Sequence, residues 1–109
     1  FKRLFNKTVD ADSNGCLQDV HWYAGLFGYF PTYSLGALTA AQLASQLRID
    51  ITNLDTQIEK GDFTKLLQWL KTNVHSKASL YSTNDILQQV TNSNLNAKYF
   101  EDYIKNRYL

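Results

Sequence analysis

Methionine is absent from this chain of 109 residues, and cysteine and proline occur once each. A polypeptide that includes its translation start carries methionine there, so we expect this chain to be a piece of a longer protein. Cys16 has no second cysteine to pair with, which is typical of a protein from a reducing compartment. Residues 1–7 are charged and contain no apolar run, so they do not have the pattern of a signal peptide.

Long hydrophobic runs and an excess of one charge are also missing. No stretch approaches eighteen consecutive apolar residues, so no membrane-spanning helix is predicted. The formal net charge is +1, with 11 basic side chains scattered among 10 acidic ones, which does not indicate a nucleic-acid-binding surface. A hydrophobic content of 44% argues against wholesale disorder. The length predicts a single domain over residues 1–109.

One stretch, residues 15–33, collects the unusual residues of the chain and reads GCLQDVHWYAGLFGYFPTY. It holds three of the five glycines, three of the seven tyrosines, and the single cysteine and proline. Glycines are costly inside a helix, and Pro31 has no N–H for a strand ladder. We therefore predict an ordered aromatic and glycine-rich loop, followed by a helix that starts near Thr32. Binding and catalytic residues concentrate in such ordered loops.

The rest of the chain has the spacing of helices, and no segment alternates as a strand would. Residues 1–7 resemble the last turns of a helix, with Phe1, Leu4 and Phe5 on one side. About five further helices are predicted, over residues 32–49, 53–60 and 63–74, from Thr83 onward, and after Asn96. The fold class is therefore all-α.

Local signals mark the ends of these helices. Gly61 suits the position just after a helix C-terminus, and Asp62 can cap the helix that follows. Ser82 and Asp85 have the spacing of a capping box, and Asn96 is a further N-terminal cap. Apolar residues of the third helix fall on one stripe: Phe63, Leu66, Leu67, Leu70 and Val74.

Residues 10–15 partly match a calcium-binding loop. Asp10, Asp12, Asn14 and Gly15 occupy the first positions of a calcium-binding EF-hand loop, but His21 stands where that loop needs a bidentate glutamate. A polar turn is the preferred interpretation, and a calcium loop is a weaker hypothesis.

The soft ligands Cys16, His21 and His75 are too few and too scattered for a zinc site of their own. Cys16 with His21 as its base would make a nucleophile, but a small residue filling a gap is a commoner use of cysteine.

His21 has two open interpretations. It is either a structural histidine held by Asp19, or part of a site in which histidine and tyrosine hydroxyls stabilise a developing negative charge. The surrounding aromatic residues fit both: Trp22, Tyr23, Tyr29 and Tyr33.

Residues 15–22 match the motif GxxQDxHW, and residues 28–33 read GYFPTY, followed by Leu-Gly and then Ala-Ala-Gln. These motifs resemble the carboxypeptidase Taq family of metallocarboxypeptidases, and the likeness extends over nearly the whole chain. The resemblance implies a mostly helical, cytoplasmic, homodimeric enzyme that removes C-terminal amino acids from peptides.

In that family zinc is bound by two histidines of a His-Glu-x-x-His helix and a downstream glutamate, and none of these is present here. The resemblance therefore implies a C-terminal portion of the enzyme that binds no metal itself. We expect it to supply one wall of the cleft and to be inactive alone.

The resemblance also implies roles for individual residues. His21 would bind substrate or stabilise the transition state, and Tyr29 is the first choice for polarising the scissile carbonyl. Tyr33 is the second choice and a substrate-binding residue, while Gln18 and Asp19 would orient His21 and its loop. Tyr23 departs from the family pattern, which has serine there. The alternative hypothesis is a non-catalytic helical module for peptide binding or dimerisation.

Overall fold

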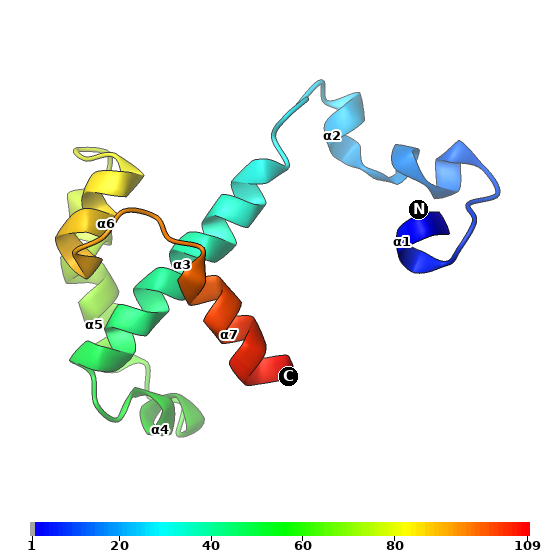
Figure 1. The fold of residues 1–109 in the computed structure, drawn as a ribbon. Helices are drawn as coiled ribbons and strands as arrows, with labels where there is room; N and C mark the ends of the chain where they lie inside the picture. The colour runs from blue at the N-terminus through cyan, green and yellow to red at the C-terminus, as the bar shows by residue number, and fades with distance from the viewer. Residues whose placement is uncertain (1) are drawn as a thin grey trace. The chain divides into compact units, whose positions relative to one another are not determined.

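The computed structural model describes residues 2–109, and this part of the chain is helical without strands (Figure 1). It contains seven α-helices and three short 3₁₀ helices: α1 (Lys2–Phe5), η1 (Asp12–Asn14), η2 (Cys16–Gln18), α2 (Val20–Tyr23), α3 (Pro31–Asp50), α4 (Leu54–Glu59), α5 (Thr64–Asn73), η3 (His75–Lys77), α6 (Thr83–Thr91) and α7 (Lys98–Tyr108). The all-α prediction is confirmed. Phe1, part of the predicted first helix, lies outside the described residues.

Residue contacts divide the chain into two compact units, Phe1–Ser34 and Leu35–Leu109. The first unit holds the aromatic stretch, and the second holds most of α3 and all later helices. The single domain predicted over residues 1–109 stays a prediction. None of the helices in residues 2–109 combines the length and apolar character needed to cross a membrane.

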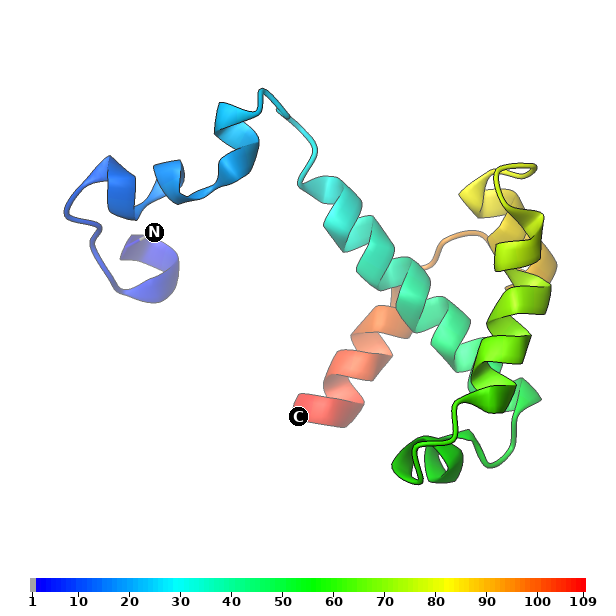
Figure 2. The ribbon, with the colours of Figure 1, turned by 180° about the vertical axis from the view of Figure 1, so that it is seen from behind.

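The hydrophobic core belongs to the second unit. Leu47 of α3, Leu54 of α4 and Trp69 of α5 are buried together. The partly buried side chains packed on them are Leu43, Ile51, Leu66, Leu70, Val74 and Val90. The Trp69 indole Nε1 donates to Asp50 Oδ2 at 2.7 Å, so the buried ring satisfies its polar group. From both sides of the molecule, α5 and α6 lie on one side of α3 and α7 on the other (Figure 2).

A buried glutamine joins α3 to the segment between α6 and α7. Gln42 is fully buried, and its Nε2 lies 2.8 Å from Thr91 Oγ1 and 2.9 Å from Ser93 Oγ. Its Oε1 accepts from the Asn96 backbone N–H at 2.9 Å. Because a buried amide is costly without such partners, this network fixes where the segment crosses α3.

The residues predicted at helix ends form hydrogen bonds there, although the N-caps of α5 and α7 are Phe63 and Ala97, each one residue after the predicted cap. Gly61 has φ +73° and donates to Ile58 O, and Asp62 N donates to Gln57 O, which is the hydrogen-bond pattern of a Schellman motif at the end of α4. At the start of α5, the Thr64 N–H donates to the Asp62 carboxylate at 3.0 Å.

Two later helix starts also have the predicted side-chain partners. Ser82 and Asp85 form both bonds of the capping box at α6. The Asn96 Oδ1 accepts from Lys98 N at 2.9 Å at the start of α7.

Two details differ from the sequence prediction. Phe63 and Leu67 of the apolar stripe are about half exposed, and Trp69, which the stripe omits, enters the core instead. The α5 side chains that contact the core are Leu66, Trp69 and Leu70, so Phe63 and Leu67 lie outside the buried face of this helix. The predicted loop at 15–33 also contains helical turns, η2 and α2. Helical geometry is possible there because both turns end before Gly25, where φ is +67°.

Candidate functional site

The aromatic stretch is shaped by two local backbone features. Asp19 is the N-cap of α2, and its Oδ1 accepts from the His21 backbone N–H at 3.1 Å. A turn with Gly28 at φ +77° then leads to α3, whose first residue is Pro31. The Thr32 hydroxyl donates to Tyr29 O at 2.7 Å and fixes the start of that helix. The two features bring α2 and the first turn of α3 together around His21.

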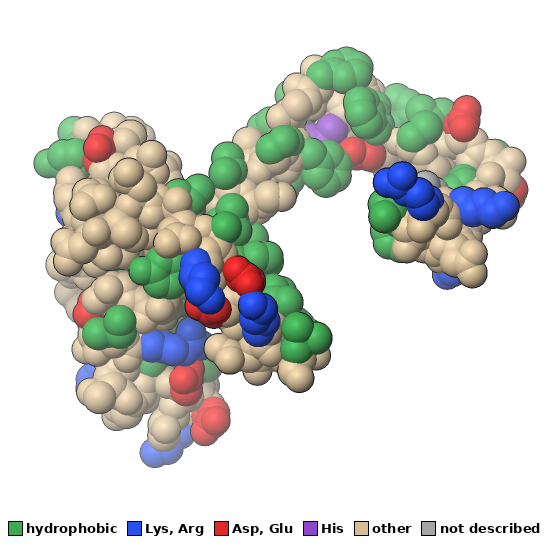
Figure 3. Space-filling model, in the orientation of Figure 1, with side chains coloured by type: hydrophobic (Ala, Val, Ile, Leu, Met, Phe, Trp, Pro, Cys, Tyr) green, Lys and Arg blue, Asp and Glu red, His purple; other side chains and the backbone are tan. Residues whose placement is uncertain are grey.

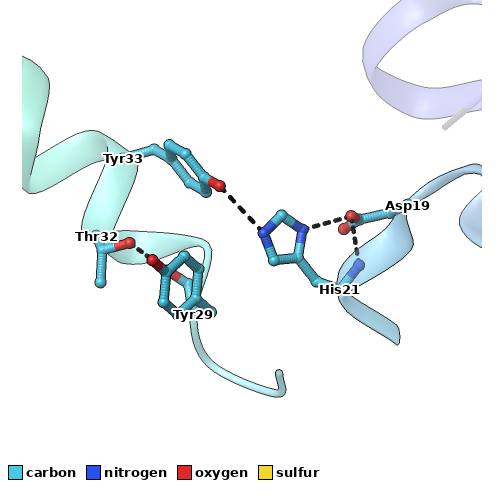
Figure 4. A network of polar contacts seen from close by, with 5 residues as sticks. All are labelled: Asp19, His21, Tyr29, Thr32 and Tyr33. Carbon is cyan, nitrogen blue, oxygen red and sulfur yellow. Dashed lines mark hydrogen bonds and ion pairs between the residues drawn. The ribbon is translucent and has the colours of Figure 1, made fainter. Parts of the chain in front are cut away.

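His21 lies between a carboxylate and a phenol (Figure 4). Its Nδ1 is 2.6 Å from Asp19 Oδ1, and its Nε2 is 3.2 Å from the Tyr33 hydroxyl. The side chains of His21 and Asp19 are 16% and 24% exposed. The sequence indicated Asp19 as a partner of this ring, whereas the contact between Tyr33 and His21 was not predicted.

Aromatic rings surround the imidazole. Tyr29 stacks on His21 with centroids 5.5 Å apart and planes at 23°, and Tyr33 meets it edge-on at 5.7 Å. Phe30 is nearest, at 5.0 Å, and is not among the site residues predicted from the sequence. Its position in the sequence between Tyr29 and Tyr33 could have indicated that Phe30 belongs to the site. Within residues 2–109 the Tyr29 hydroxyl has no hydrogen-bond partner, and Tyr29 is 45% exposed.

The charge of Asp19 is favoured by its partner. Partial burial raises the pKa of this carboxyl, but hydrogen bonds from the His21 side chain and backbone outweigh it and hold the pKa below its ordinary value. Asp19 is therefore an ionised acceptor at neutral pH. An ionised carboxylate only accepts hydrogen bonds, so Nδ1 of His21 carries a proton.

The other candidate residues lie outside this cluster. The Gln18 amide donates to Ser13 O and thereby joins η2 to the preceding loop. The Tyr23 hydroxyl donates to Leu17 O at 2.8 Å. Cys16 is exposed, and His75 belongs to η3 in the second unit.

The acidic loop before the aromatic stretch is held by a hydrogen bond between two of its own side chains. The Asn14 amide donates to Asp10 Oδ1 at 3.0 Å, and this bond lowers the pKa of the Asp10 carboxyl. Across residues 2–109 there is no group of three or more His, Cys, Asp and Glu side chains placed to hold a metal ion.

Large apolar side chains of the first unit are exposed. Figure 3 shows hydrophobic side chains on the visible face of the segment around α2. The most exposed large ones between η2 and α3 are Phe27 at 74%, Tyr23 at 67% and Val20 at 66%. No residue from 2 to 34 is buried. The His21 cluster is thus set in a surface that is apolar and uncovered.

Comparison with known proteins agrees with the motifs. The family model described as Carboxypeptidase Taq (M32) metallopeptidase matches residues 1–108. Carboxypeptidase 1 of Bacillus subtilis is 42% identical over 101 residues, which cover 93% of this chain and 20% of that protein. Thermostable carboxypeptidase 1 of Pyrococcus furiosus is 36% identical over 97 residues, covering 89% of this chain and 19% of that protein.

Solved structures give the same result. The structure titled Trypanosoma Cruzi Metallocarboxypeptidase 1 matches with a TM-score of 0.91 and 41% identity, over 98% of this chain and 23% of that one. The chain spans about one fifth of the length of the curated relatives it matches. The match to the family model and these relatives together show that the chain belongs to the carboxypeptidase Taq family of metallopeptidases.

Proposed function

We propose that the complete protein is a zinc-dependent carboxypeptidase that hydrolyses C-terminal residues from peptides, and that this chain is its C-terminal portion. We further propose that the protein is cytoplasmic and a homodimer, and that this chain alone is inactive. Family membership supports the activity. The observation that carries the role of this chain is the clustering of His21, Tyr29 and Tyr33, with Asp19 behind the histidine.

The metal is proposed for the complete protein alone. The described residues offer no group that fits a metal ion, so the zinc ligands would lie outside this chain. The proposed contribution of this chain is therefore to bind the peptide and to stabilise the transition state with its own side chains.

Tyr29 is the side chain that we propose acts on the scissile carbonyl. Its hydroxyl is free of partners among residues 2–109, and its ring is fixed by stacking on His21. As charge develops on the carbonyl oxygen, a phenol hydroxyl donates a stronger hydrogen bond to it than to the uncharged substrate. Such a bond lowers the barrier because it strengthens in the transition state.

Tyr33 and His21 form the substrate-binding part of the wall. Their mutual hydrogen bond orients both groups, and Asp19 fixes the ring from the other side. Gln18 holds the preceding loop rather than the ring, through Ser13 O. This arrangement gives the cluster a fixed geometry before a substrate arrives, which is what transition-state stabilisation needs.

The test is hydrolysis of N-acylated dipeptides by the complete protein. We expect release of the C-terminal amino acid, loss of activity with a chelator, and recovery with Zn²⁺. Tyr29→Phe should lower kcat by roughly 10²–10³-fold with a smaller change in KM. Tyr81→Phe is the matched control, because Tyr81 is equally exposed at 49% and lies in the second unit.

Two results would contradict the proposal in different ways. Peptide binding without any hydrolysis by the complete protein would favour the non-catalytic binding module. Equal losses in Tyr29→Phe and Tyr81→Phe would leave the enzyme in place and remove Tyr29 from its chemistry.

A further inference from the structure

Asp19, His21 and Tyr33 form a chain of hydrogen bonds, and this chain determines which atom carries each proton. The carboxylate holds a proton on His21 Nδ1 at 2.6 Å. In the neutral ring Nε2 then has a lone pair and only accepts, so the hydrogen bond of 3.2 Å is donated by the Tyr33 hydroxyl. The single donor of Tyr33 is occupied by the histidine in this state.

Protonation of the ring reverses that bond. When Nε2 gains a proton, it becomes a donor and the Tyr33 oxygen becomes its acceptor. The Tyr33 O–H is then free to rotate toward another oxygen. Tyr33 is 57% exposed, so its side chain is open to solvent.

We propose that Asp19 is a positioning residue that makes anion binding at Tyr33 dependent on a proton taken up by His21. The proton comes from solvent and binds Nε2. Nε2–H then donates to the Tyr33 oxygen, and the Tyr33 O–H donates to a carboxylate or to the developing carbonyl anion. No covalent bond of Tyr33 is broken, and one proton is bound for each anion. The titratable groups facing the ring are Asp19, Tyr29 and Tyr33.

The choice of an anionic oxygen as ligand rests on the proposed function, but the proton arrangement does not. Asp19 determines which group donates in each hydrogen bond of this chain, because it accepts twice from His21, through the backbone N–H and through Nδ1. An acceptor without that charge would allow the neutral ring to carry its proton on Nε2. Tyr33 would then be free to bind an anion without any proton uptake.

The test is NMR of the complete protein labelled with ¹⁵N-histidine, with His21 signals assigned by their loss in His21→Gln. We expect a neutral His21 with pyrrole-type Nδ1 and pyridine-type Nε2. At the lowest pH where the free protein shows this neutral ring, saturating acetate should convert His21 to the imidazolium. Acetate affinity should weaken about tenfold per pH unit above that point, because one proton is linked to binding.

Asp19→Asn should instead show a neutral ring protonated on Nε2 that stays neutral when acetate binds. Asp12→Asn is the matched control, since Asp12 is an exposed carboxylate of the same unit, and it should behave as the wild type.

Three outcomes would overturn the proposal: a wild-type ring protonated on Nε2, a ring that stays neutral with acetate, or unchanged proton uptake in Asp19→Asn. The wild-type tautomer is decisive even if Asp19→Asn does not fold. These failures leave peptidase activity untouched, whereas an inactive complete protein would refute the proposed function and not the proton arrangement.

Discussion

Asp19 binds one neighbour twice, through the backbone and the side chain of His21. Its Oδ1 caps α2 and also holds the imidazole of His21. Helix capping and ring orientation therefore depend on the same oxygen. A substitution at this position therefore acts on local folding and on the site together.

The first prediction concerns acid stability at Asp19. Its pKa is held below the ordinary value by the hydrogen bonds from His21, so the carboxylate stabilises the folded state above the unfolded pKa, near 3.9. That contribution is lost as pH falls through the lower, folded pKa. We expect the Tm advantage of the wild type over Asp19→Asn to be full at pH 7 and to vanish as the pH falls below about 4.

Thermal unfolding of both proteins across pH measures this advantage. The carboxyls of Asp10, Asp62 and Glu101 also have lowered pKa values, but they are present in both proteins and cancel in the difference. An advantage that is constant with pH would contradict the role of the Asp19 charge.

The sequence predicted which residues belong to the site better than it predicted which of them contact each other. Asp19 and His21 are two residues apart, so their contact follows from local geometry. Tyr33 is twelve residues from His21, and its contact depends on the turn at Gly28 and on the entry into α3. Local rules do not fix the direction of such a turn, so the contact between Tyr33 and His21 could not be predicted from the sequence.

At the level of elements, caps were predictable because each one is a contact within a few residues. Gly61 and Ser82 act where the sequence placed them, and Asn96 accepts from Lys98 N one residue before the N-cap Ala97. The core was less predictable, because which residue of α5 is buried depends on distant elements. Trp69 is buried against Leu47 and Leu54, whereas its neighbour Leu67 is not.

The second prediction tests a cap in isolation. Ser82→Ala removes the side chain that accepts from Asp85 N at 3.2 Å, and leaves one backbone donor of α6 without its partner. We expect a loss of about 1 kcal/mol in the free energy of unfolding. Ser79→Ala is the matched control, since Ser79 is exposed in the preceding turn and caps no helix. Urea denaturation compares the two variants, and equal losses would mean that the capping box does not contribute.

For the molecule as a whole, the two units differ in whether they have a hydrophobic core of their own. The second unit has a buried core, while no residue from 2 to 34 is buried. The chain matches only about one fifth of the length of its relatives. An apolar surface without cover is costly in water, so we infer that the rest of the polypeptide covers the first unit in the complete protein.

The third prediction is that the isolated chain self-associates through the first unit. Its apparent mass in sedimentation experiments should rise with concentration, because exposed side chains such as Val20 and Phe27 find cover in a second copy. Val20→Ser with Phe27→Ser should reduce this association.

The matched control is Ile49→Ser with Leu80→Ser, because these side chains are as exposed, at 71% and 79%, but lie in the second unit. If both double variants reduce association equally, exposed apolar area in general is responsible rather than the first unit. If the wild-type chain is monomeric at all concentrations, the exposed apolar side chains of the first unit do not drive association, and the prediction is wrong.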